Sequence, residues 1–474
     1  MRSLLGLGVA LCALTGPAIG DDLYFGFTRL DPEAQSVVAD SYVVVRDGLI
    51  LSAGQGDAPE ASYENRHDMS GLYALPGFID AHGHLVAGPH TVEVEDGAPV
   101  VKMDSIDEVT RYNARMALAF GVTTVRNPGG STEAAAAYDR NIAEGRWTGP
   151  DALHAGAVIQ PPPFGGSAFA YPASQAEWDA EAARQAEAGM SYFKLYHGLS
   201  EDELALGIEA AHAHGLDAIA HLDQVSWTRA AELGIDGLLH SLPTSADLLP
   251  EAERDAYTAS LGRDSTPLYR WFELADLDGP EITHMLATLV EHDVSVDLTL
   301  TVNAMMTETD PAAVFFPPEE AAYLHPQSRD GMLAMLPLST YGWTPEDFSR
   351  ARAAMEQVYA FARRVDAAGV TLLLGTDGNG GGPALARELE FHARAGFTNW
   401  EILELATSRN ADGLGLSEQT GRIAPGLEAD LVFLARNPLD DIGHVRSVEW
   451  VVTNGQAHSF ADLTANPAAQ NGED

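Results

Sequence analysis

The hydrophobic pattern divides the chain into a long central part and two shorter ends. In residues 74–415, short apolar runs alternate with segments whose apolar residues recur at the helical period. The eight runs are 77–81, 122–126, 152–156, 192–195, 218–220, 237–240, 294–298 and 371–374. Helical patterns such as 179–188, 201–214 and 348–368 lie between them. Eight strand–helix repeats predict an α/β fold, a (β/α)8 TIM barrel, whose active site lies at the C-terminal ends of its strands.

The two ends of the chain have a different pattern. Residues 21–73 and 416–460 contain short stretches that alternate between apolar and polar positions, with hairpin turn signals at Asp47-Gly48 and Asn454-Gly455. Two β-rich segments at opposite ends of a chain predict one small β-sandwich domain built from both. Residues 461–474, which are most polar from Asn466 onward, are expected to form a disordered tail.

The first twenty residues have the pattern of a signal peptide. Arg2 precedes an apolar stretch at 4–14 that is too short to span a bilayer, and small residues lead up to Gly20. We expect cleavage after Gly20, export to the periplasm or the medium, and no stable membrane insertion of the mature chain. The only cysteine, Cys12, would leave with the signal peptide, so we expect no disulfide and no cysteine ligand in the mature protein.

Composition narrows the possible partners. A formal net charge of −42 lacks the basic footprint of a nucleic-acid-binding protein, and it disfavours adsorption to anionic lipid. With 46% hydrophobic and 20% charged residues, the chain has a globular composition. A small molecule is the expected partner, and a homo-oligomer remains possible on the sequence alone.

Lysine is almost absent, which makes one lysine informative. Of the 27 basic side chains, only Lys102 and Lys194 are lysines. Lys194 lies in an aromatic and apolar run where a lone ammonium would be costly to bury. Unlike arginine, a buried lysine can lose its proton, and the neutral amine can react with carbon dioxide to form an anionic carbamate. The alternative is a lysine paired with a buried Asp or Glu.

Metal-ligating residue types follow the predicted strands. His82 and His84 come after the first strand and share one side of the chain, because residues two apart on a strand point the same way. The other candidates are Lys194 in strand four, His221 after strand five, His240 after strand six and Asp377 after strand eight. Singly, such histidines are more often core groups and such an Asp more often a turn former. Together the six predict a site for zinc or a similar divalent ion.

Two stretches carry a family resemblance. The run from Leu75 to His84 resembles the entry motif of the amidohydrolase superfamily, and the run from Thr420 to Val432 resembles its closing motif. The order His-x-His, Lys, His, His, Asp is similar to that of the binuclear members. The resemblance implies two divalent metal ions, usually zinc, bridged by hydroxide and by Lys194 carboxylated by CO2. It implies that His82, His84 and Asp377 bind one ion and that His221 and His240 bind the other.

The implied chemistry is hydrolysis by the bridging hydroxide, with Asp377 moving the proton to the leaving group and Lys194 as the other catalytic residue. The strand-four pattern looks most like the branch with imidazolonepropionases and prolidase-like dipeptidases. We therefore expect cleavage of an amide or cyclic amide bond in a dipeptide or N-acyl amino acid. Alternatives are a lactone, carbamate or phosphoester substrate at the same site, and a solute-binding barrel without catalysis.

Substrate contacts are harder to assign. Tyr196 and Arg126 are candidates, with a packed aromatic and a structural ion pair as the respective alternatives. Many dipeptidase-like members carry Gly-Gly-His after strand three, whereas this chain has a run from Gln160 to Ser167 without histidine. Long segments at 241–293 and 303–369 contain Met and aromatic residues, which suit either a lid over an apolar pocket or the cores of inserted helices.

Overall fold

The computed structural model describes residues 21–95, 98–162, 164–261, 265–305, 307, 318–378 and 382–465. The predicted signal peptide at 1–20 lies outside these residues, as does the predicted tail from 466 onward. The first residues of that tail are ordered in a short helix, α17 (Phe460–Thr464), which buries Leu463.

All eight strands expected in the central part are present and parallel. They are β6 (Phe78–Asp80), β9 (Val122–Asn127), β10 (Asp151–His154), β13 (Tyr192–Leu195), β14 (Asp217–Ala220), β15 (Gly237–Leu239), β16 (Ser295–Asp297) and β17 (Thr371–Leu373). The order β10-β9-β6 forms one sheet, and the order β13-β14-β15-β16-β17 lies in a second, which β11 (Val158–Ile159) and β12 (Phe169–Ala170) extend. The sequence therefore predicted the α/β class and every one of these strands correctly.

The predicted closed barrel does not form one continuous ladder. Isolated parallel bridges join the two sheets at both edges, one between Ala155 and Tyr192 and one between Gly83 and Gly378. Ala81 N also donates to Leu374 O at 3.0 Å, so β6 and β17 are neighbours. The strands contain only three to six residues each, which leaves short ladders with gaps between them.

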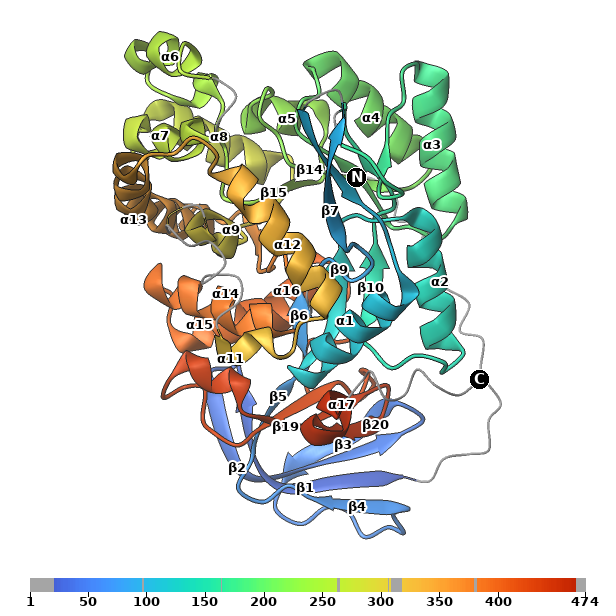
Figure 1. Ribbon diagram of the computed structural model, residues 1–474. Coiled ribbons are helices and arrows are strands. Elements are labelled where there is room, and N and C mark those ends of the chain that lie inside the picture. Colours follow the sequence, from blue (N-terminus) through green and yellow to red (C-terminus); the bar gives the residue numbers. More distant parts are fainter. Residues whose placement is uncertain are drawn as a thin grey trace.

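Helices follow these strands and cover the sheets (Figure 1). They are α1 (Asp107–Ala119), α2 (Thr132–Ala143), α3 (Gln175–Glu187), α4 (Glu201–Ala213), α5 (Trp227–Leu233), α8 (Pro280–Glu291), α13 (Pro345–Ala367), α14 (Pro383–Arg394), α15 (Asn399–Glu404), the π-helix η2 (Leu405–Arg409) and α16 (Asn410–Gly413). Ser200 begins α4 and Thr344 begins α13 with capping boxes, which satisfy backbone N–H groups that have no partner inside the helix. Within the described part of the chain, none of the helices is both long and apolar enough to cross a membrane.

Strands from both ends of the chain share one sheet. They are β1 (Asp22–Asp31), β2 (Ser36–Arg46), β3 (Leu49–Gln55), β4 (Asn65–Asp68), β5 (Tyr73–Pro76), β18 (Leu431–Leu434), β19 (Val448–Thr453) and β20 (Gln456–Ser459). Their order is β20-β19-β18-β5-β1-β2-β3, with β4 also on β1. In Figure 1 the blue and red strands lie together below the central part.

The predicted sandwich of two sheets is not confirmed, because all eight end strands belong to this single sheet. Two register shifts in β1, on either side of Phe27, let its first half pair with β4 and its second half with β5. Phe27 and Tyr24 pack against Phe433 of β18, at ring-centroid distances of 5.3 and 6.0 Å, so the two chain ends share one core.

Two insertions and a hairpin complete the chain. The first insertion holds η1 (Ala246–Leu248), α6 (Glu251–Thr258) and α7 (Thr266–Leu274), and the second holds α9 (Leu300–Met305), α11 (Pro318–Ala321) and α12 (Pro326–Ser339). The hairpin of β7 (His90–Glu95) and β8 (Ala98–Met103) follows β6, and a 3-10 helix, η3 (Ile442–Arg446), precedes β19. Figure 1 shows α12 running beside β7.

Among the aromatic residues of these insertions, for which the sequence left a lid and helix packing open, Trp343 packs between helices. Trp343 contacts Tyr269 of α7 and Phe348 of α13, with ring centroids 5.2 and 5.1 Å apart. Tyr341 is 76% exposed, and Phe315-Phe316 lie outside the described residues. These contacts are those of inserted helices with their own core.

Candidate metal centre

The six predicted ligands all lie at the C-terminal ends of the parallel strands. His82 and His84 follow β6, His221 follows β14, His240 follows β15, and Asp377 lies beyond the end of β17. Lys194 is the third residue of β13, and its ladder partner is Ile219 on β14. The ligand set is therefore assembled by the strand order, from positions nearly three hundred residues apart.

Two imidazoles and one carboxylate converge on a single point. Asp377 Oδ1 lies 3.1 Å from His82 Nε2 and 3.0 Å from His84 Nε2. His84 Nδ1 donates to Gly129 O at 3.2 Å, so its Nε2 carries the free lone pair. One ligand atom from each of His82, His240 and Asp377 also falls within 4.8 Å of the other two. This donor set suits a divalent cation.

His82 is oriented by a residue that the sequence analysis did not assign. Its Nδ1 donates to Asp297 Oδ2 at 2.6 Å, and Asp297 is fully buried at the end of β16. Burial favours the neutral form of His82, but Asp297 and Asp377 outweigh it and raise its pKa. A carboxylate behind a ligating histidine fixes its tautomer and ring orientation, which leaves His82 Nε2 directed at Asp377.

His240 and His221 continue the ring of imidazoles. His240 lies 4.9 Å from His82 and 4.5 Å from His221 between ring centroids. Its Nδ1 is 2.6 Å from Thr299 Oγ1. His221 Nδ1 is buried and has no hydrogen-bond partner, which leaves a ring nitrogen ready for a ligand. Burial holds the pKa of both rings well below the ordinary value, so both are neutral and able to bind a metal.

Three residues with strained backbone conformations lie at this site. His240, Thr299 and Asp377 have φ values of 68°, 40° and 53°, in the left-handed region that side chains other than glycine seldom adopt. For the β-branched Thr299 such a conformation is unusual. Strained backbone persists where the surrounding structure holds a functional geometry, and here it lies at two candidate ligands and the partner of one of them.

Lys194 has the environment of an uncharged amine. It is 2% exposed, and in the described part of the chain no carboxylate forms an ion pair with it. Burial lowers the pKa of the Lys194 ammonium to about 7, against the attraction of Asp377. The alternative of a lysine paired with a buried acid is not what these residues show. The Nζ atom lies 5.2 Å from the ring centroid of Tyr196, which also faces His221 at 4.8 Å.

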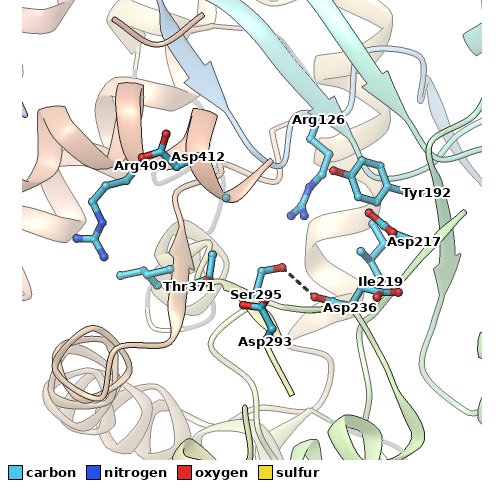
Figure 2. Close-up of a pocket in the computed structure, with 12 residues that line it drawn as sticks. Arg126, Tyr192, Asp217, Ile219, Asp236, Asp293, Ser295, Thr371, Arg409 and Asp412 are labelled. Atoms are coloured by element: carbon cyan, nitrogen blue, oxygen red, sulfur yellow. Dashed lines mark hydrogen bonds between the residues drawn. The ribbon is translucent and has the colours of Figure 1, made fainter. Parts of the chain in front are cut away.

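Arg126 lies in a structural ion pair, the alternative to the predicted substrate contact. Its Nη2 is 3.0 Å from Asp297 Oδ2, its Nε donates to Ala81 O at 2.6 Å, and it is 1% exposed. Its guanidinium carbon lies 5.6 Å from the ring centroid of Tyr192, and Figure 2 shows the two side chains next to each other. The side chain thus supports the carboxylate that orients His82.

Figure 2 also shows the cavity that Arg126 lines, about 470 Å³ in volume. Its other walls include Tyr192, Asp217, Ser295 and Thr371, the first residues of β13, β14, β16 and β17. This cavity therefore opens at the N-terminal ends of the strands, opposite the metal ligands.

Asp297, Thr299 and Gln160 are the functional candidates that sequence reasoning missed. For Asp297 a signal existed, since a carboxylate inside the apolar run 294–298 must find a buried partner. For Thr299 and Gln160 the sequence offers no such signal, because neither side chain is charged.

Comparison with known proteins identifies the family of this chain. The model of the amidohydrolase family matches residues 73–458. Ochratoxinase from Aspergillus niger is 32% identical over 126 residues, 26% of this chain and 26% of the relative, so the chain spans about a quarter of its length. Imidazolonepropionase from Sphingopyxis alaskensis is 25% identical over 254 residues, 46% of this chain and 62% of the relative.

A crystal structure of a Xaa-Pro dipeptidase with bound methionine in the active site is similar in fold, with a TM-score of 0.65 and 17% identity. The similarity covers 93% of this chain and all of that one, at 100%. The family match over residues 73–458 shows that this chain belongs to the amidohydrolase family.

Proposed function

We propose that this protein is a metal-dependent hydrolase that cleaves the C–N bond of an amide or cyclic amide. The observation that carries the proposal is the convergence of His82 Nε2, His84 Nε2 and Asp377 Oδ1, with His240 beside them. The similar proteins, an ochratoxinase, an imidazolonepropionase and a dipeptidase, support a C–N bond as the target. A dipeptide or N-acyl amino acid is our proposed substrate class.

Two divalent ions, with zinc as the first candidate, would occupy the centre. His82, His84 and Asp377 would hold one ion, and His221 and His240 the other. The unpartnered His221 Nδ1 and the neutral state of His221 and His240 support this division. Bound cations supply Lewis-acid chemistry and bring the pKa of a coordinated water toward neutrality.

Lys194 would bridge the ions as a carbamate. A pKa lowered to about 7 leaves a large share of the amine neutral, and only the neutral amine attacks carbon dioxide. Conversion of the Lys194 ammonium to a carbamate would replace a buried positive charge with a negative charge near the four imidazoles. The lack of a carboxylate partner in the described residues supports this chemistry, because an ion pair would hold the proton in place.

Asp377 would move the proton during hydrolysis. Burial raises the pKa of Asp377, but the adjacent rings of His82 and His84 outweigh it and keep the pKa well below its usual range. An ionised carboxylate can take a proton from the attacking water and give it to the leaving nitrogen. Tyr196, whose pKa burial raises, stays protonated and can donate to a substrate oxygen.

Two further features belong to the same proposal. We infer a closed eight-stranded barrel around the centre, supported by the bridges Ala155–Tyr192 and Gly83–Gly378. We also infer export, supported by the signal pattern of residues 1–20.

Replacement of the bridging lysine tests the proposal. Lys194→Ala should remove most bound zinc and most amide hydrolysis, and bicarbonate with a short carboxylic acid should restore part of both. Lys102→Ala is the matched control, because the only other lysine forms a half-exposed ion pair with Glu93 at 2.6 Å. A metal-replete, fully active Lys194→Ala enzyme would contradict the proposal. Lactones, carbamates and phosphoesters in the same assay separate the bond types, and a wild-type protein that binds no zinc would indicate a solute-binding barrel.

A further inference from the structure

Gln160 directly follows β11, on the side of the metal centre. Ile159 of β11 is the ladder partner of Leu195 of β13, and both belong to the apolar core outside the sheet. Because side chains alternate along a strand, Gln160 faces the same side as Tyr196, and Tyr196 the same side as Lys194. The amide of Gln160 therefore points to the region where a substrate would meet the metal ligands.

The amide of Gln160 is only half satisfied. Gln160 is 2% exposed, and its Nε2 donates to His197 Nε2 at 3.0 Å. Its Oε1 is buried and has no hydrogen-bond partner in the structure. A buried carbonyl without a donor costs free energy, and such atoms in native proteins usually meet a water or a ligand.

His197 fixes the arrangement of this pair. His197 Nε2 accepts a hydrogen bond from Gln160 Nε2, so the ring's own proton lies on Nδ1. Its ring centroid is 4.7 Å from Tyr196 and 5.9 Å from His221, and Phe164 packs on it at 5.8 Å. The aromatic contacts hold His197 in place beside the candidate ligand His221. Because His197 accepts from Gln160 Nε2, it also fixes the Gln160 amide, whose Oε1 remains without a hydrogen-bond partner.

The charge around the pair favours a cationic donor. Asp223 Oδ1 accepts a hydrogen bond from Gly198 N at 2.8 Å, which places a carboxylate next to His197. An ammonium group satisfies both the orphan acceptor and the nearby Asp223 carboxylate better than a neutral hydroxyl would.

We infer that Gln160 Oε1 accepts a hydrogen bond from the free α-ammonium group of the substrate. Gln160, positioned by His197, would then select amides that carry this ammonium group on the carbon next to the cleaved carbonyl. The inference rests on the proposed function and narrows its substrate class to dipeptides with a free amino terminus. N-acyl amino acids that lack this donor leave Oε1 unpaired and are poorer substrates.

Matched substrates test the inference. For each dipeptide that the wild-type enzyme cleaves, the des-amino acyl counterpart keeps the scissile amide and removes only the ammonium group. The wild type should prefer the dipeptide by about tenfold or more in kcat/KM. Gln160→Leu should reduce that preference to within about threefold, chiefly by raising KM for the dipeptide, with bound zinc unchanged. Gln419→Leu, a change at an exposed glutamine, should leave the preference intact.

A second variant keeps the test decisive if Gln160→Leu folds poorly. Gln160→Glu retains the acceptor and should keep or strengthen the preference for the free amino terminus. Equal rates for the two members of a pair in the wild type, or an undiminished preference in Gln160→Leu, would overturn the inference alone. A zinc-loaded enzyme that cleaves no amide in the panel would overturn the proposed function itself.

Discussion

Replacement of Asp297 separates metal binding from stability. Asp297 Oδ2 accepts from His82 Nδ1 at 2.6 Å and from Arg126 Nη2 at 3.0 Å, and all three side chains are buried. In Asp297→Leu the His82 ring loses the partner that fixes its orientation. Loss of such a partner typically weakens metal binding 10- to 100-fold, which is about 1.4–2.8 kcal/mol.

The same substitution leaves Arg126 as a buried charge without its carboxylate, and this should lower stability by about 3–5 kcal/mol. The double variant Arg126→Met/Asp297→Leu removes both charges. An apolar pair of similar volume is often neutral or stabilising, so the double variant should recover most of the lost stability. Its zinc affinity should stay low, because His82 still lacks a partner.

Zinc affinity is measured by competition with a chromophoric chelator, and stability by denaturant unfolding of the metal-free protein. Glu320→Leu is the matched control, because Glu320 is buried and pairs with Arg387 at 2.8 Å and Arg446 at 2.9 Å. It should lose stability without a change in zinc affinity. Recovery of wild-type zinc affinity in the double variant would refute the orienting role of Asp297.

Three further predictions concern the site and its surroundings. The pKa of Lys194 falls from 10.5 to about 7 on folding, so between these pH values the unfolded chain binds more protons and the stability of the metal-free protein rises with pH. Lys194→Met should flatten this rise. If the free energy of unfolding in urea rises with pH equally in the wild type and in Lys194→Met, this prediction is wrong. Thr299→Val deprives His240 Nδ1 of its partner and should weaken zinc binding about tenfold by the same chelator assay. Gly331→Leu should separate α12 from β7 and expose α12 to limited proteolysis, because a Cβ at Gly331 would lie 2.3 Å from His90 O.

Much of the site could be predicted because strand periodicity and residue chemistry are both local. The apolar runs ending at Ala81 and at 240 mark the ends of two strands. The eight strand–helix repeats then place His82 and His240 together at the C-terminal ends of the strands. The structure places the predicted metal ligands at that face. What periodicity cannot supply is the pairing of side chains across strands, such as His82 with Asp297, 215 residues apart.

The same limit explains why two parts of the fold prediction are not confirmed. Whether strands from two chain ends form one sheet or two depends on hydrogen bonding and on register shifts such as those around Phe27, and neither follows from alternation of polar and apolar residues. Likewise, the interrupted ladder between β6 and β17 reflects strands of three residues each, whose ends the sequence defines only to within a residue or two.

Arg126 shows how burial decides between roles that the sequence leaves open. At the end of a barrel strand, an arginine suits either a substrate carboxylate or an internal acid, and both need the same bidentate donor. Asp297, which is fully buried, must itself have cationic or hydrogen-bonding partners, because an isolated carboxylate there would be strongly disfavoured. Because Arg126 is paired with Asp297, it is not available to bind a substrate. Substrate selection then depends on groups that still have unused hydrogen-bonding capacity. In the described part of the site, Gln160 Oε1 is such a group, which is why the proposed specificity lies just after β11.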